Sequence, residues 1–153
     1  MKIAFCGHAS YTGNEKDERR VLTLLEHITG NAPAEFFLGE HGGFDRFAYA
    51  CAKRFKHHHP NAQLIWITAY YPPRQGHLQH TEYDLVLYPP LEYVPPRYAI
   101  SHRNRWLVEQ ADVIIACVTN SFGGAHEMYQ YAKRNKKTIY NIASASAVDS
   151  SID

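Results

Sequence analysis

Three polar turns of this sequence contain glycine, and each follows an apolar run and precedes a stretch of helical periodicity. They are Gly7-His8, Gly42-Gly43-Phe44-Asp45 and Gly123-Gly124. Glycine lets backbone N–H groups approach a ligand closely, and the helix N-terminus that follows favours negative charge. In an open parallel sheet, such turns gather at one edge. The sequence therefore predicts a site for a phosphate-bearing or otherwise anionic small molecule. Glycine turns also commonly connect a strand to a helix without binding a ligand.

Two carboxylates accompany these turns. Asp45 lies where a helix begins, and Glu127 falls in the first helical turn after Gly124. Helix capping and the helix dipole favour acidic side chains at both positions, so a structural role is one explanation. A carboxylate beside an anion-binding turn can also hold ribose hydroxyls or attack an anomeric carbon. Both residues are therefore candidate catalytic groups, and Asp45 is a candidate ligand-binding group as well.

Arg103 and Asn104 form a third candidate group. On a helix that begins at Ser101, Asn104 shares a face with Ile100 and Leu107, the face expected to meet the sheet. A buried amide needs hydrogen-bond partners. It can tie down a neighbouring loop, or it can hold a sugar hydroxyl while the Arg103 guanidinium pairs with a phosphate. We favour the second interpretation.

The histidines do not form a recognisable metal-binding pattern. His8 follows Gly7 at the end of the first apolar run, where it can reach a ligand or serve as a plain loop residue. The three histidines at 57–59 end a helix, and consecutive residues on a helix point in different directions. His77 and His80 lack carboxylate or thiolate partners at a recognisable spacing. We predict no metal site and assign no cofactor.

Short, nearly all-apolar strands alternate with amphipathic helices along the chain. The predicted strands are 3–6, 35–39, 64–69, 113–118 and 138–142. The first predicted helix has acidic residues at 15–18, an apolar stripe at 21–28 and Gly30 after its end; the second has its stripe at 44–55, and the others cover 101–110 and 125–135. This alternation predicts an α/β fold of the Rossmann-like, doubly wound kind, with a mainly parallel sheet of about five strands and helices on both faces. Gly7, Gly43 and Gly124 would then lie at the carboxyl edge of that sheet.

We predict a single domain over residues 1–142, because a chain of 153 residues can bury one core without a metal or a disulfide. Prolines and tyrosines interrupt the pattern at 70–100, which we interpret as a functional insertion, with 83–88 able to add one short strand. The tyrosines can stack on a base or pack against the sheet. Residues 143–153 are small and polar, and we predict a flexible tail.

Composition limits the classes of partner. The 16 Lys and Arg nearly balance the 15 Asp and Glu, giving a formal net charge of +1, so nucleic acid is an unlikely partner. No apolar run is long enough to cross a bilayer and no leader is recognisable, which predicts a cytoplasmic protein without a membrane partner. The three cysteines lie far apart within apolar patterns, as buried thiols do in a reducing compartment. A homo-oligomer is possible.

In their order along the chain, the motifs resemble those of the SLOG superfamily, particularly its YpsA-like branch. The motifs are Phe5-Cys6-Gly7-His8, Gly42-Gly43-Phe44-Asp45, Tyr98 followed by Arg103-Asn104, Ala111-Asp112 and Gly123-Gly124-Ala125, and the likeness runs to about Ile142. Such proteins are Rossmann-like and include LOG-type phosphoribohydrolases, the DprA DNA-processing core and modules thought to sense nucleotide derivatives. The resemblance implies a nucleotide pocket lined by Gly7, Gly42, Gly43, Asp45, Arg103, Asn104, Gly123 and Gly124.

The sequence departs from the LOG enzymes, which carry a longer PGGxGTxxE signature. Here the glycine pair follows Phe122 rather than proline and lacks the Gly-Thr pair. The stretch 123–132, GGAHEMYQYA, is instead similar to the turn and helix of nucleoside deoxyribosyltransferases and related N-glycosidases, in which a glutamate at this place is the nucleophile. That similarity implies Glu127 as nucleophile, with Asp45 assisting the departing base.

Two functions follow from these comparisons of motifs. The first is a binding or sensing module for a nucleotide-like small molecule, either ADP-ribose-like or a nucleoside phosphate. The second is an N-glycosidase or transferase that uses Glu127. The first needs fewer assumptions, and we prefer it. A DprA-like binder of single strands would be expected to carry an excess of positive charge.

Overall fold

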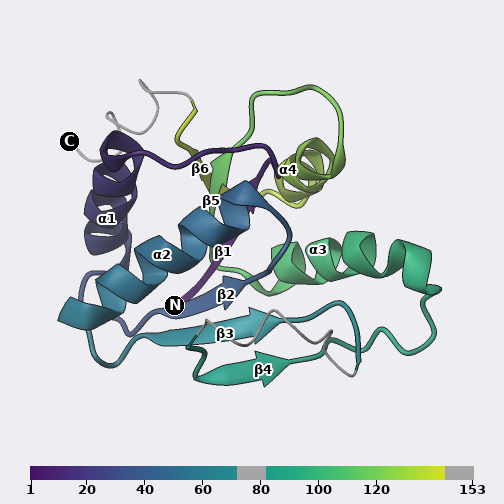
Figure 1. The fold of residues 1–153 in the computed structure, drawn as a ribbon, viewed down its shortest axis with the longest axis horizontal. Coiled ribbons are helices and arrows are strands. Elements are labelled where there is room, and N and C mark those ends of the chain that lie inside the picture. The colour runs from purple at the N-terminus through teal and green to yellow at the C-terminus, as the bar shows by residue number, and fades with distance from the viewer. Residues whose placement is uncertain (72–81, 144–153) are drawn as a thin grey trace.

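A computed structural model of the chain describes residues 1–71 and 82–143. The predicted Rossmann-like α/β fold is confirmed (Figure 1). The elements are β1 (Lys2–Gly7), α1 (Glu15–Thr29), β2 (Glu35–Leu38), α2 (Gly43–His58), β3 (Gln63–Ile67), β4 (Leu85–Leu87), the 3-10 helix η2 (Pro96–Tyr98), α3 (Ala99–Gln110), β5 (Val113–Cys117), α4 (Gly124–Arg134) and β6 (Thr138–Asn141).

All strands of the sheet are parallel, in the order β4-β3-β2-β1-β5-β6. The strand order reverses at β1, which pairs with β2 on one side and with β5 on the other, with Ile3 opposite Val113. In open α/β sheets, ligands bind in the crevice outside the carboxyl ends of the strands at this reversal. The topology thus places the predicted site next to Gly7 and Cys117.

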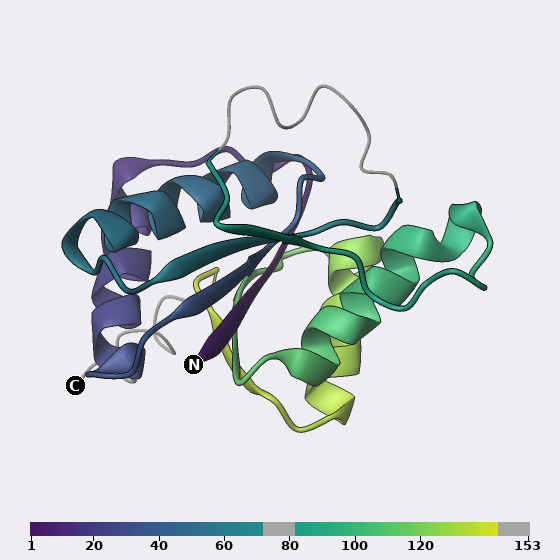
Figure 2. The same ribbon diagram turned by 90° about the horizontal axis from the view of Figure 1, so that it is seen from below.

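Helices cover both faces of the sheet (Figure 2): α1 and α2 lie on one side, and α3 and α4 lie on the other. Each helix buries the apolar stripe seen in its sequence. In α1, for example, Val21, Leu24 and Leu25 recur at helical spacing and are fully buried. Every residue of β5 is buried, as expected for a central strand covered on both faces.

The sheet has six strands, where about five were predicted with one more allowed at 83–88. The sixth strand, β4, lies within the 83–88 segment that could add a strand, and it pairs with β3 at the edge of the sheet. Leu85 and Val86 are half-exposed, so this short edge strand lacks the buried pattern of the central strands. The predicted insertion at 70–100 therefore contains β4 and η2 in its described part. His77, His80 and residues 144–153 of the predicted tail lie outside the described residues.

The predicted start of α3 at Ser101 is wrong. Pro96 opens the 3-10 turn of η2, which continues without a break into α3 at Ala99, so Ser101 lies inside the helix and is exposed. The buried face of α3 is formed by Ala99, Arg103, Leu107 and Val108. Asn104, which we expected on that face, is half-buried.

The cysteines Cys6, Cys51 and Cys117 are all buried, with free thiols, as predicted. Burial raises the pKa of Cys6 and of Cys51 to about 12, so both stay protonated and unreactive near neutral pH. Among the described residues, no helix combines the length and the apolar character needed to cross a bilayer.

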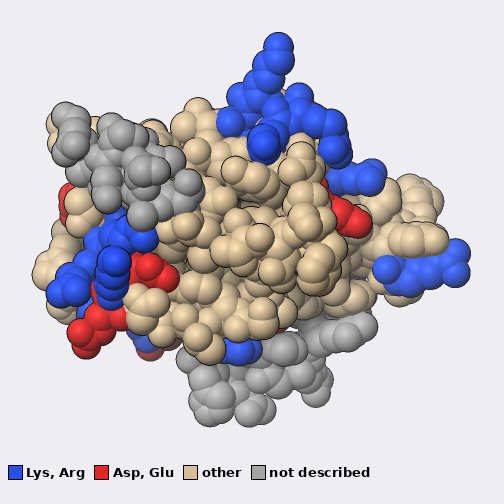
Figure 3. Space-filling model, turned by 90° about the horizontal axis from the view of Figure 1, so that it is seen from above, with Lys and Arg blue, Asp and Glu red and all other residues tan. Residues whose placement is uncertain are grey.

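Positive side chains form separate groups on the face shown in Figure 3, and they do not join into one continuous track. Two basic residues, Lys133 and Arg134, occupy the last turn of α4. Cations are favoured there by the helix dipole.

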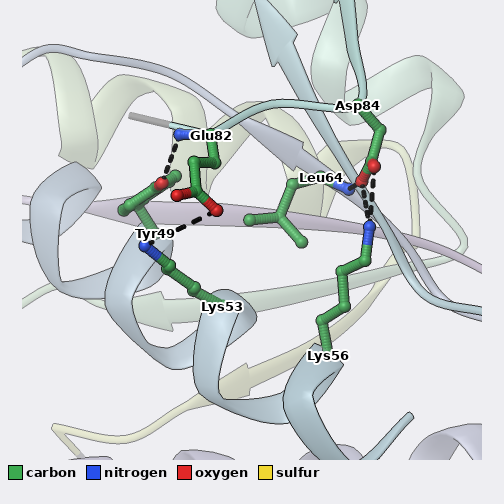
Figure 4. A network of polar contacts seen from close by, with 6 residues as sticks. All are labelled: Tyr49, Lys53, Lys56, Leu64, Glu82 and Asp84. Carbon is green, nitrogen blue, oxygen red and sulfur yellow. Dashed lines mark hydrogen bonds and ion pairs between the residues drawn. The ribbon is translucent and has the colours of Figure 1, made fainter. Parts of the chain in front are cut away.

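A polar network holds the start of β4 against α2 (Figure 4). The Nζ atom of Lys56 donates to both carboxylate oxygens of Asp84, at 2.6 and 2.7 Å. Asp84 also accepts the backbone N–H of Leu64 at 2.8 Å. Nearby, the N–H of Glu82 donates to the hydroxyl of Tyr49 at 2.6 Å. These contacts fix the register in which β4 joins the sheet.

Asp84→Asn is expected to lower the free energy of unfolding by about 1 kcal/mol at neutral pH. Partial burial raises the pKa of Asp84, but the hydrogen bonds from Lys56 and Leu64 and the charge of Lys56 outweigh it, so the pKa lies below its ordinary value of 3.8. Because the folded-state pKa is the lower one, the stabilisation is complete well above pH 3.8 and is lost as the pH falls through the folded-state value. Urea denaturation of both chains across this pH range measures the difference.

Glu82→Gln is the control for this prediction. The Nζ of Lys53 lies 3.9 Å from the Glu82 carboxylate, and the two side chains are 52% and 84% exposed. Such a solvated pair contributes little. We expect no measurable change, and a loss as large as that of Asp84→Asn would mean that net charge, rather than the Lys56 contact, determines the effect.

Candidate functional site

A cavity of about 410 Å³ lies where the carboxyl ends of the strands meet α3 and the β5–α4 loop. We call it the sheet-edge pocket. Its walls include all the predicted binding residues except Gly42 and Gly43, namely Gly7, His8, Asp45, Arg103, Asn104, Gly123 and Gly124. The loops that the sequence predicted to converge therefore do so in the structure.

Arg103 is the most unusual residue of this pocket, because its charged side chain is only 3% exposed. Its Nη1 donates to the carbonyl of Ile67 at 3.3 Å and its Nη2 to the Oδ1 of Asn104 at 3.0 Å. Within the described residues, the Nε atom has no hydrogen-bond partner and the guanidinium forms no ion pair with a carboxylate. Burial lowers the pKa of Arg103, although the charge of Asp45 opposes this.

Gly39 makes room for this arginine, and the sequence analysis did not identify it as a site residue. A Cβ atom at Gly39 would lie 2.7 Å from Nη1 of Arg103 and 3.0 Å from Oδ2 of Asp45. The same Asp45 oxygen accepts the N–H of His41 at 2.7 Å. The sequence feature that could have identified Gly39 is its place immediately after the apolar run of β2, at the edge of the sheet where ligands bind.

His8 joins two of the converging loops. Its Nε2 atom accepts the backbone N–H of Thr119 at 3.1 Å and that of Asn120 at 3.2 Å. An imidazole nitrogen that accepts hydrogen bonds carries no proton, so the ring proton is on Nδ1. His8 therefore positions the β5–α4 loop while its ring lines the pocket.

The Gly42-Gly43 turn is occupied by the protein's own backbone. The N–H of Gly43 donates to the carbonyl of Ala9 at 2.8 Å, and the N–H of Phe44 donates to the carbonyl of His8 at 3.3 Å. A Cβ atom at Gly43 would lie 1.9 Å from the carbonyl oxygen of Tyr11. The β1–α1 loop thus covers the N-terminus of α2, and close packing alone accounts for these glycines.

The N-terminus of α4 is open by contrast. Gly123 has a φ of 91° and the helix has no side-chain cap. Among the described residues, the N–H groups of Gly124, Ala125 and His126 donate no hydrogen bond. No atom lies within 4 Å of a Cβ built at Gly123 or at Gly124. These free donors, at the positive end of a helix dipole, form an anion-binding wall.

Phe122 is a second pocket residue that the sequence analysis did not identify. Its ring is 71% exposed although it lines the pocket beside the glycine pair. An exposed aromatic ring at the rim of a polar cavity can stack on a planar group of a ligand.

The two candidate catalytic carboxylates do not share a cavity. Asp45 lines the sheet-edge pocket. Glu127 is exposed on α4 and lines a groove between α3 and α4. It is not among the residues that surround the pocket. The two carboxylates therefore line neighbouring cavities, which share Asn104 and Gly124.

Comparisons with known proteins show similarity in structure only. No protein-family model and no curated protein matches the sequence. The fold is similar to DNA processing protein A from Helicobacter pylori, for which a single-stranded DNA binding mode is described, with a TM-score of 0.62 at 18% identity over 91% of this chain and 63% of that one. It is also similar to DprA from Streptococcus pneumoniae, with a TM-score of 0.60 at 15% identity over 99% of this chain and 54% of that one.

A third similar structure is the molybdenum cofactor binding protein of the phototrophic bacterium Rippkaea orientalis, with a TM-score of 0.58 at 18% identity over 95% of this chain and 80% of that one. The chain spans less than two thirds of the length of the two DprA proteins. At these identities, the comparisons show the fold alone, a Rossmann-like fold shared with the two DprA proteins. They give no support to the expectation that nucleic acid is an unlikely partner.

Gly43→Ala is expected to lower the free energy of unfolding by about 2 kcal/mol or more, because the new methyl group would collide with the Tyr11 carbonyl. Gly124→Ala is the matched control, since its Cβ meets open space, and we expect a change within about 0.5 kcal/mol. Thermal or urea unfolding of the two variants checks the contrast. Equal stabilities would show that the β1–α1 loop does not pack on α2 as described.

Proposed function

We propose that this chain binds a nucleotide or nucleotide-derived small molecule, ADP-ribose-like or a nucleoside phosphate, in the sheet-edge pocket and acts as a binding or sensing module. We further propose that it belongs to the YpsA-like branch of the SLOG superfamily. The observation that carries this proposal is the buried guanidinium of Arg103, which has no carboxylate partner among the described residues.

A buried charge without an opposite charge costs free energy, so an anion beside Arg103 would stabilise the folded protein. The guanidinium fork suits phosphate oxygens. The free N–H groups at Gly124 and Ala125 would provide further donors to the same group. Asn104 and Asp45 would hold ribose hydroxyls, and the exposed ring of Phe122 would stack on the base.

The alternative function, an N-glycosidase or transferase with Glu127 as nucleophile, finds no specific support in the geometry. Glu127 lies in the α3–α4 groove, whereas the phosphate-binding features lie in the sheet-edge pocket. For a ligand held by Arg103 and the N-terminus of α4, we therefore favour a binding function over a reaction in which Glu127 attacks the sugar.

Arg103→Met is expected to abolish the rise in melting temperature that nucleotides produce. A ligand at 100 times its dissociation constant adds about 2.7 kcal/mol of stability to the wild-type chain. We expect the shift from at least one member of a panel of AMP, GMP, ADP-ribose and NAD, measured by thermal unfolding. Without ligand, Arg103→Met should be as stable as the wild type or more so, because the unpaired buried charge is gone.

Asn104→Asp provides a second test that keeps the side-chain size. It places a carboxylate at the oxygen that already accepts from Arg103, so it should stabilise the free protein and compete with a phosphate. Arg46→Met, on the exposed side of α2, is the control and should leave the shifts unchanged. The proposal is wrong if no nucleotide shifts the wild-type melting temperature, or if the shift survives in Arg103→Met.

A further inference from the structure

The groove between α3 and α4 encloses about 640 Å³ and adjoins the sheet-edge pocket, with which it shares lining residues. The residues that line both cavities are Ile100, Asn104, Gly124 and Met128. These residues form the boundary between the two spaces. A ligand bound at the carboxyl edge of the sheet can therefore extend into the groove without leaving the protein surface.

The groove is positively charged. Arg97, Arg105 and Arg134 line it, and Glu127 is the acidic residue among its lining residues. Within residues 1–71 and 82–143, none of the three arginines forms an ion pair. Arg134 lies in the last turn of α4. The groove is thus lined by three guanidinium groups and one carboxylate, that of Glu127.

Two of these arginines are held around one aromatic ring. The Cζ atoms of Arg105 and Arg134 lie 5.8 and 5.9 Å from the centroid of the Tyr131 ring. The ring is itself fixed, because its hydroxyl donates to the carboxylate of Glu109 at 2.6 Å. Cation–π contacts restrict the guanidinium groups while leaving their N–H donors free. Both guanidinium groups therefore lie on the side of the groove that Tyr131 lines.

We propose that the α3–α4 groove is a second anion-binding subsite that takes a further phosphate group of the ligand bound in the sheet-edge pocket. This inference rests on the proposed function, and it specifies the ligand class: a nucleotide with at least two phosphate groups, of dinucleotide size. Phosphate suits the groove because Arg105 and Arg134 present planar forks that match its oxygens. Glu127 lies among these arginines and lowers the net positive charge of the groove.

The test compares the double variant Arg105→Gln/Arg134→Gln with the wild-type chain by isothermal titration calorimetry. The probes are inorganic tripolyphosphate, the dinucleotide pApA and AMP. Loss of two charge-assisted contacts should weaken the binding of tripolyphosphate and of pApA by about tenfold or more. AMP fills only the sheet-edge pocket, so its dissociation constant should change by less than about twofold between the two chains.

Lys16→Gln/Arg19→Gln on α1 is the charge-matched control, because both residues are exposed and belong to neither cavity. It should leave all three affinities unchanged. The inference is overturned if the two double variants lose equal affinity for tripolyphosphate, if the wild type does not bind tripolyphosphate, or if a hexaglutamate peptide binds as tightly. In the last case, the groove would favour acidic peptides.

The same titrations separate the two proposals. If Arg103→Met loses AMP but keeps tripolyphosphate, both subsites exist and are distinct. If no chain binds AMP while tripolyphosphate binding still depends on Arg105 and Arg134, the proposed function fails and the groove stands as an anion site. If AMP binds normally but pApA binds the wild type and Arg105→Gln/Arg134→Gln with equal affinity, the proposed function stands and the groove inference fails.

Discussion

The carboxyl end of β1 is the constraint on which the rest of the site depends. Gly7 has no side chain, so the ring of Phe44 packs where a Cβ would lie, with the nearest ring carbon at 2.2 Å from that position. This contact lets α2 approach the strand closely enough for its first N–H groups to bond the loop that follows β1. His8, the next residue, then holds the β5–α4 loop from the other side.

This arrangement makes the two glycine-led helix N-termini different. The β1–α1 loop satisfies the N–H groups at the start of α2, whereas those at the start of α4 stay free. Arg103 reaches the same region from α3 because Gly39 leaves space for its guanidinium. Two sources of positive potential therefore converge on one cavity, a helix dipole and a buried side chain. The acidic residue of this pocket is Asp45. Among the described residues, its carboxylate forms no ion pair with the Arg103 guanidinium.

Much of the fold could be predicted from the sequence, because each central strand is a short apolar run and each helix has an amphipathic period. The turns with Gly7 and Gly123 also pointed to the correct edge. The role of Gly43 could not be predicted, since its contact with the Tyr11 carbonyl depends on how two distant backbone segments cross. The burial of Arg103 rather than Asn104 depended on how α3 is rotated against the sheet, which the spacing of its apolar residues did not settle.

The pairing of β1 with β5 has a consequence for how the protein acquires its site. Ile3 lies opposite Val113, and Cys6 donates to the carbonyl of Ala125, 119 residues further along the chain. Contacts of such sequence separation require a long loop to close, and they form slowly. During synthesis, β1 cannot pair with β5 until residues 113–117 have left the ribosome. The crevice therefore cannot form before β5 and the start of α4 have been synthesised.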